Sequence, residues 1–188
     1  DGTFTNTVDA DWSSADGIVA NERTYNDVTA YAYDASQDTA TAAFTTGGLT
    51  LSKTDGGVTS ATIGTIIRYT VTLTAPLGTV RNLVVTDSLP TGLAYAGNAS
   101  LGANISPQIA PNQSGQNLIW NFGSAVITPT NAVTLAFDAL VSNTASNVSG
   151  VVRTNYVTLT HSAVTGTLRT RTANDGFTIT EPIEVISK

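Results

Sequence analysis

The sequence lacks cysteine and methionine altogether, and it is poor in charge. Among its 188 residues, 12 % are charged, and the formal net charge is −6. Without cysteine, no disulfide bond can stabilise the fold. The acidic balance offers no basic surface for nucleic acid or for an anionic membrane. No apolar run approaches the roughly 18 residues of a membrane-spanning helix, so no membrane span is expected in this chain.

Lysine is also scarce, with two lysines against six arginines. Lys53 ends the strand-like segment 48–53, and Lys188 ends the strand-like segment 182–188. Arginine would satisfy a need for positive charge alone. A buried lysine, unlike arginine, can lose its proton and act as a nucleophile. The pattern therefore indicates that a primary amine is needed, the alternative being chance in a lysine-poor chain.

Alternation of apolar and polar residues is the main pattern that the sequence does contain. It recurs in short runs separated by glycine, proline and asparagine, and no window keeps a helical period over three turns. Strands at this spacing are typical of a β-sandwich and not of βαβ units. We predict an all-β fold, a Greek-key sandwich, with strands in the runs 66–74, 83–87, 118–122, 132–141 and 154–160.

The chain also resembles itself. Segment 5–13 (TNTVDADWS) matches segment 154–162 (TNYVTLTHS). Each is followed by a glycine turn, an arginine-containing stretch, an Asn-Asp pair and a Thr-rich strand that leads into a lysine strand. Such self-similarity is typical of tandem repeats.

The repeat phase predicts how the chain is divided. Asn6 and Lys53 follow one another in the same order as Asn155 and Lys188. We therefore expect three parts: the C-terminal strands of a preceding repeat or a donor segment (residues 1–47), one complete domain (residues 48–181) and the first strand of a following repeat (residues 182–188).

Lys53 and Asn155 are the residues of the complete domain that could carry chemistry. They lie on an early and a late strand, which can be neighbours in a Greek key. Attack of a lysine amine on an asparagine carboxamide releases ammonia and leaves an amide cross-link. It needs a neutral amine and a carboxylic acid that carries protons. Asp87 is the first candidate for this helper and Asp138 the second; the alternatives are a turn-capping Asp87 and an outward-facing Asp138.

Five motifs carry a family resemblance: LSKT at 51–54, GTIIRYTVTL at 64–73, NLVVTDSLPTGL at 82–93, WNFG at 120–123 and TNYV at 154–157. With them the chain resembles the prokaryotic cell-surface conserved repeat domain, catalogued as domain of unknown function 11. The resemblance implies a tandem Ig-like module of a long surface protein. It also implies an intradomain isopeptide bond, here between Lys53 and Asn155. The segment 75–78 (APLG) departs from the usual Asn-Thr-Gly of the family, which affects only a loop.

Weaker signals concern ions and sugars. Acidic side chains at alternating positions can hold calcium, and we name Asp9, Asp11 and Asp16 as candidates, with solvated loop residues as the alternative. No other cofactor is expected. The lone His161 is expected on a strand surface, and Trp120 in the core. N-glycosylation triplets, which also arise by chance in polar β proteins, begin at Asn98, Asn104, Asn112 and Asn147.

These features favour a structural role outside the cell. We expect a repeat of a prokaryotic cell-surface stalk, adhesin or extracellular filament, which at most forms its own cross-link once and turns over no substrate. The competing interpretation is a carbohydrate-binding sandwich module of a secreted protein, which would need an exposed aromatic platform. Expected partners are neighbouring copies or adjacent repeats, and host or surface glycans.

The two ends of the chain suggest a way of assembling. Asn6 has no lysine strand before it, and Lys188 has no asparagine strand after it. An unpaired strand can add to the sheet of another chain, so we expect head-to-tail association by strand addition. A Lys188–Asn6 cross-link between subunits would be its covalent form. The plainer interpretation is that the sequence is an excerpt of a longer chain.

Overall fold

The computed structural model describes residues 2–8, 12–13, 24–25, 40–46, 48–75, 78–127, 132–163 and 166–181. The chain divides into two compact units, Asp1–Gly47 and Gly48–Lys188. The boundary between them falls where the first predicted segment ends. The predicted segment 182–188 lies outside the described residues.

The first unit contains two pairs of antiparallel strands. Strand β1 (Gly2–Val8) pairs with β4 (Ala40–Thr46), and β2 (Trp12–Ser13) pairs with β3 (Thr24–Tyr25). Residues 5–8 of β1 are exposed. A two-stranded ribbon is at best marginally stable alone in water.

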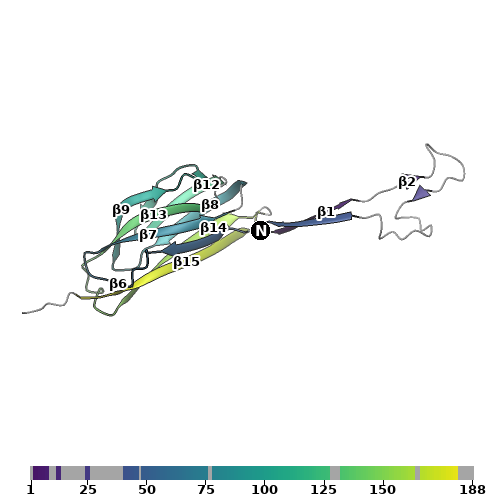
Figure 1. Ribbon diagram of the computed structural model, residues 1–188. Helices are drawn as coiled ribbons and strands as arrows, with labels where there is room; N and C mark the ends of the chain where they lie inside the picture. Colours follow the sequence, from purple (N-terminus) through teal and green to yellow (C-terminus); the bar gives the residue numbers. More distant parts are fainter. Residues whose placement is uncertain are drawn as a thin grey trace, which may run out of the picture. The chain divides into compact units, whose positions relative to one another are not determined.

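The second unit is a sandwich of two mainly antiparallel sheets (Figure 1). The 4-stranded sheet has the order β5-β7-β13-β9, and the 7-stranded sheet the order β10-β12-β8-β14-β15-β6, with β11 paired to β12. The all-β prediction is thereby confirmed. The strands are β5 (Thr50–Thr54), β6 (Ser60–Ala61), β7 (Ile66–Thr74), β8 (Gly78–Ser88), β9 (Leu93–Leu101), β10 (Ile105–Ser106), β11 (Asn112–Ser114), β12 (Asn117–Ile127), β13 (Ala132–Val141), β14 (Val152–Ser162) and β15 (Leu168–Ile179).

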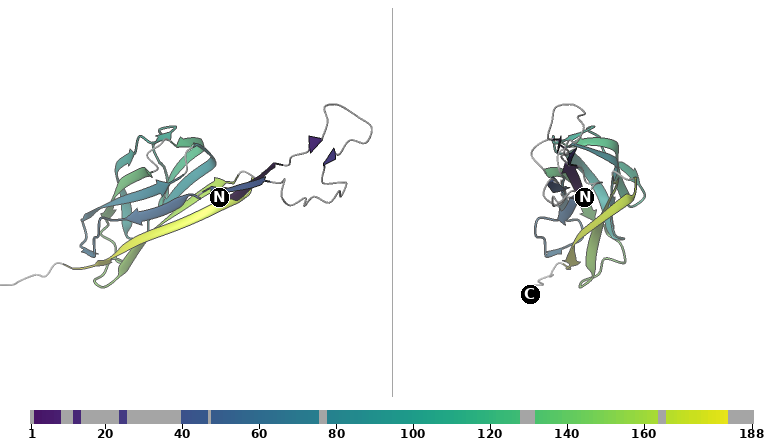
Figure 2. Two further views of the ribbon diagram at one scale, coloured as in Figure 1. Left: turned by 45° about the vertical axis from the view of Figure 1, so that its right-hand side comes forward. Right: turned by 90° about the vertical axis from the view of Figure 1, so that its right-hand side faces the viewer.

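The core lies between the two sheets, which Figure 2 shows from two further directions. Alternate residues along β7, β8, β12, β13 and β14 are buried, as expected for strands with one inward face. The largest fully buried side chains are Trp120, Tyr69, Phe137 and Phe177, with leucine and isoleucine around them. Threonine and valine fill the strand positions because branched side chains suit a pleated surface.

Two predicted strands coincide with the structure, and three, β8, β12 and β14, are longer than predicted. The runs 66–74 and 132–141 match β7 and β13. Strands β8 and β12 continue through irregular positions, with Asn82 at φ 52° and Gly123 at φ 61°. The register between β8 and β12 shifts on both sides of Gly123. Such bulges let pairing continue past residues that a sequence reader takes for a turn.

Side chains of β15 cover the open edge of β5. Among the described strands, β5 pairs with β7 alone. The Arg171 guanidinium Nε donates to the Leu49 carbonyl at 3.1 Å, and the Asp55 backbone N–H donates to Asp175 Oδ2 at 2.7 Å. These contacts close one side of the sandwich, because β5 and β15 belong to different sheets.

The loop after β13 is held by Asn147, whose side chain points inward. Its Nδ2 donates to the carbonyls of Gly92 and Ser142, both at 2.8 Å, and its Oδ1 accepts from Arg153 Nε at 2.7 Å. Every hydrogen-bonding atom of this amide is therefore used.

Among the described residues, no helix is long and apolar enough to cross a membrane.

We predict that Gly92→Ala destabilises the sandwich more than Gly97→Ala does. Both glycines have left-handed backbone angles, with φ at +97° and +91°, which costs an alanine roughly 1–2 kcal/mol. A Cβ on Gly92 would also overlap Asn147 Oδ1, whereas a Cβ on Gly97 meets nothing within 4 Å. Overpacking costs a further ~1–3 kcal/mol. Equal unfolding free energies of the two variants in urea would contradict this role of Asn147.

Candidate functional site: a lysine, an aspartate and an asparagine in the core

Lys53 lies on the inward face of β5. It is opposite Val71 of β7, and its side chain is completely buried. The Nζ atom lies 4.6 Å from the centre of the Tyr69 ring and 5.4 Å from that of Phe137. A lysine side chain is rarely buried without a partner. The two rings offer the amine some attraction, but they do not replace a hydrogen-bonding partner.

Asp87 faces Lys53 from the other sheet. It lies on the inward face of β8, between Leu118 of β12 and Val157 of β14, and it is fully buried. Lys53 Nζ donates to Asp87 Oδ2 in a short contact, and Asp87 Oδ1 has no hydrogen-bond partner. The pair therefore joins the two sheets through the core.

Asn155 completes the group from β14. It points inward like Val157, the residue opposite Asp87, and it is fully buried. Its amide is near enough to Asp87 to favour the charged carboxylate, but neither Nδ2 nor Oδ1 is in hydrogen-bonding geometry with any group. A buried polar group without a partner costs about 1–3 kcal/mol. Such a group calls for a particular explanation.

Burial shifts both ionisable groups toward their neutral forms. Desolvation lowers the pKa of Lys53, and the attraction of Asp87 opposes this only in part. Desolvation likewise raises the pKa of Asp87 against the attraction of Lys53. An ion pair in a core is penalised in the same way. Both shifts are in the direction of a free amine beside a protonated carboxylic acid, the pairing that amine attack on an amide requires.

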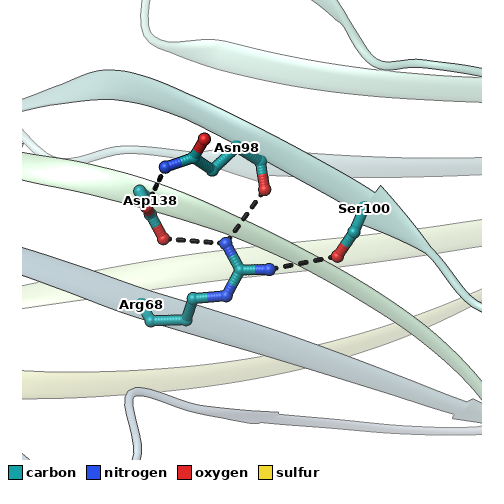
Figure 3. A network of polar contacts seen from close by, with 4 residues as sticks. All are labelled: Arg68, Asn98, Ser100 and Asp138. Carbon is teal, nitrogen blue, oxygen red and sulfur yellow. Dashed lines mark hydrogen bonds and ion pairs between the residues drawn. The ribbon is translucent and has the colours of Figure 1, made fainter.

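Asp138, the second candidate helper, lies elsewhere. Its carboxylate is held on the outer face of the 4-stranded sheet (Figure 3), where Oδ1 accepts from Arg68 at 2.8 Å and Oδ2 from Asn98 at 2.6 Å. Arg68 also donates to the Asn98 carbonyl and to Ser100 Oγ. The network fastens the edge strand β9 to β13 and β7. Asp138 therefore does not share the site of Lys53, and Asp87 is the remaining candidate.

The other predicted residues are scattered. Asn6 is exposed on β1 opposite Ala42, and it lacks the burial that surrounds Asn155. Asp9, Asp11, Asp16 and Lys188 lie outside the described residues. Within the part of the chain that is described, no cluster of three or more acidic, histidine or cysteine side chains could hold a metal ion.

Two surface predictions need correction. Asn147 is only 3 % exposed and fully hydrogen-bonded, so it is no accessible glycosylation site. His161 is 6 % exposed and not on the surface, because it continues the inward series 155, 157, 159 along β14. Burial lowers its pKa. Of the remaining triplets, Asn112 is exposed, Asn98 is exposed but binds Asp138, and Asn104 Nδ2 donates to the Ala132 carbonyl at 3.0 Å.

Sequence reasoning missed two carboxyl groups beside the site. Asp55 is 4 % exposed, and its Oδ1 accepts from the backbone N–H groups of Gly57 and Val58. Asp175 lies directly opposite Asn155 in the β14–β15 pair and accepts from the Asp55 N–H. The position of Asp175 in the hairpin was a usable signal, since cross-strand neighbours lie on the same face of a sheet.

No family model matches the sequence, and no curated protein sequence matches it significantly. Similar structures are known. The major pilin subunit BcpA of Bacillus cereus superposes with a TM-score of 0.52 at 16 % identity, over 70 % of this chain and 40 % of that one. A variant of that pilin with one Asp-to-Ala substitution gives 0.54 at 14 % identity over the same shares.

This chain thus spans less than half the length of that pilin. The fold is an Ig-like β-sandwich. At these identities the likeness establishes the fold and no activity. The resemblance to the conserved repeat domain stays a prediction.

We predict that Asp138 stabilises the fold in a pH-dependent manner. Hydrogen bonds from Asn98 and Arg68 hold the pKa of Asp138 below its ordinary value of 3.8. A lowered folded-state pKa gives stability that is present above 3.8 and is lost as the pH falls through the folded value. The stability difference between wild type and Asp138→Asn should therefore shrink on acidification. The control Ser100→Ala keeps the carboxylate, and its difference from wild type should change little with pH; equal pH profiles for both variants would contradict the assignment.

Proposed function

We propose that the chain is a structural segment of a prokaryotic cell-surface stalk, adhesin or extracellular filament, whose sandwich is cross-linked by an isopeptide bond between Lys53 and Asn155. The observation that carries the proposal is the buried group itself. A lysine and an aspartate, both shifted toward neutrality, lie with an asparagine amide that has no hydrogen-bond partner. An ordinary hydrophobic core gains nothing from such a group. The isopeptide bond that the resemblance to the conserved repeat domain implies would explain its presence.

The atoms of the proposed reaction balance, with ammonia as the leaving group. Neutral Lys53 Nζ attacks Asn155 Cγ while protonated Asp87 polarises the Asn155 carbonyl. Asp87 then carries a proton from Nζ to Nδ2, the Cγ–Nδ2 bond breaks, and ammonia leaves. One amide forms and Asp87 returns to its starting state, so no oxidant or other reactant is needed. Because the reaction consumes the Lys53 amine and the Asn155 carboxamide, the bond forms once and no substrate is turned over.

The bond would serve a surface stalk mechanically. Lys53 belongs to one sheet and Asn155 to the other, so an amide between them ties the layers together covalently. A chain without cysteine cannot obtain this from disulfides. Pulling on the domain would then meet covalent resistance before the sheets separate.

We further propose that copies associate head to tail by strand addition. Unit 1 contains the β1–β4 pair and is followed by β5, which carries Lys53. The second unit ends with the β14–β15 hairpin, which is followed by segment 182–188 with Lys188. The same order of elements therefore occurs twice along the chain. The exposed β1 residues include Val8, at 58 % exposure. A lysine strand from another copy would bury them, as main-chain pairing does in strand addition.

Among the described residues, Trp120 gives the carbohydrate-binding alternative no support. Trp120 is 1 % exposed and packs against Phe137 with ring centres 6.1 Å apart. It therefore forms part of the core and offers no platform for a sugar.

The first test is the intact mass of the purified chain under denaturing conditions. We predict a deficit of one ammonia in the wild type and none in Lys53→Met, Asn155→Ala or Asp87→Asn. Asp138→Asn is the matched control for the acid and should keep the deficit. A full-length mass without any deficit in the wild type would refute the cross-link.

The same variants should lose stability. The bond closes a loop of about 100 residues, for which loop-closure entropy alone amounts to about 4–5 kcal/mol. Because 1 kcal/mol corresponds to roughly 2–4 °C for a domain of this size, Asn155→Ala should melt about 10–20 °C below wild type. A difference of only a few degrees would contradict a cross-link that stabilises the sandwich.

The test of assembly is the size of the native particle. We predict concentration-dependent association of the full chain in sedimentation, which is lost when residues 182–188 are deleted. Boiling in detergent separates the two forms, since only a Lys188–Asn6 bond would survive as a ladder on denaturing electrophoresis. A monomer at every concentration would refute strand addition.

A further inference from the structure

We propose that Asp175, together with Asp55, is a positioning group for the cross-linking reaction: it fixes the end of the lysine strand beside Asn155 through a carboxyl pair that shares one proton. The inference rests on the proposed function above. It concerns residues that lie outside the Lys53–Asp87–Asn155 group but touch the strands that carry it.

Asp175 connects the two reacting strands. It is the cross-strand partner of Asn155 on β15, so the two side chains lie on the same face of the sheet, about 4.5–5.5 Å apart at their Cβ atoms. The same carboxylate accepts the backbone N–H of Asp55 at 2.7 Å, two residues after Lys53. Hydrogen bonds to a charged acceptor are the stronger kind. Asp175 therefore holds the Lys53 strand at a fixed position relative to Asn155.

Asp55 shows where a proton must lie. Its Oδ1 accepts from two turn N–H groups, at 3.0 Å from Gly57 and 2.9 Å from Val58, whereas its Oδ2 is buried without a partner. A buried, unpaired carboxylate oxygen next to a second carboxylate is unfavourable. A proton on Oδ2 turns it into a donor toward Asp175, as in carboxyl pairs that share one proton. In agreement, burial raises the pKa of Asp55, and the neighbouring Asp175 contributes to the increase.

The shared proton matters for Lys53. Among the described residues, Lys53 on β5 interacts electrostatically with Asp175, Tyr69 on β7 with both carboxyl groups of the pair, and Asp87 on β8 contacts Lys53. Asp175 attracts the ammonium form of Lys53, which cannot attack an amide. With one proton in the pair, a single negative charge is left. Loss of that proton at higher pH adds a second charge, which favours the ammonium and pushes Asp55 away from Asp175.

The test follows cross-linking during refolding. The full chain is collected as unfolded inclusion bodies, diluted from denaturant into buffers across a pH series, quenched in acid, and weighed for the loss of one ammonia. Asp175→Ala removes both the acceptor and the charge. It should slow cross-linking about tenfold or more, which is the factor expected from losing a charged hydrogen bond. Asp175→Asn keeps an acceptor oxygen for the Asp55 N–H but removes the charge.

Loss of the Asp55 proton should add a fall with rising pH to the wild-type profile that the Asp175→Asn profile lacks, whereas protonation changes of Lys53 and Asp87 act on both chains alike. A merely structural role for Asp175 would lower yields without changing the shape of the pH profile. Asp138→Asn, which removes a carboxylate of the outer network, is the control and should keep the fall with rising pH that Asp175→Asn loses. If Asp175→Ala does not fold, the pH profile of Asp175→Asn decides.

The outcomes separate the two proposals. A wild-type chain that never loses ammonia refutes the proposed cross-link and this role with it. A wild type that cross-links at the same rate and with the same pH profile as both Asp175 variants refutes the positioning role alone. Hydrogen exchange of the Asp55 amide gives a second readout: it should accelerate in Asp175→Ala and stay slow in Asp175→Asn.

Discussion

The buried contact between Lys53 and Asp87 is the constraint around which the candidate site is built. It places an amine and a carboxyl group between two sheets, where neither is solvated. Burial lowers the pKa of Lys53 and raises the pKa of Asp87, so both shifts favour the uncharged forms. As a salt bridge, such a pair contributes little net stability, because desolvation offsets the attraction. In the proposed reaction, Lys53 is the nucleophile and Asp87 the acid, and these roles would account for the unpaired Asn155 carboxamide beside them.

The surrounding strands serve this contact in different ways. Tyr69 and Phe137 enclose the amine with their rings. Strand β15 reaches across to β5 with Arg171 and Asp175 and closes the side of the sandwich next to the site. The polar network around Asp138 fastens the opposite edge, β9, on the outer face. The proposed chemistry thus lies in the core, and the outer face of the 4-stranded sheet carries ordinary hydrogen bonding around Asp138.

Much of this was predictable from the sequence, and the remainder was not for physical reasons. The period of two located β7 and β13, and the scarcity of lysine singled out Lys53. The same period of two, counted from Asn155 along β14, predicts that His161 points inward. It could not separate Asp87 from Asp138, because that choice depends on which face each strand buries and on a partner, Arg68, distant in sequence. The roles of Asp55 and Asp175 likewise depend on contacts between separate sheets.

Peptide mapping of the wild-type chain tests the central claim most directly. Trypsin cannot cleave after a lysine whose amine has become an amide, so the account predicts one branched species in which peptide 24–68 is joined to peptide 154–169 through Lys53 and Asn155. Fragmentation would place the new amide on those two side chains. Separate peptides 24–53 and 54–68 would contradict the account, and so would a bond from Lys53 to Asp87 with loss of water.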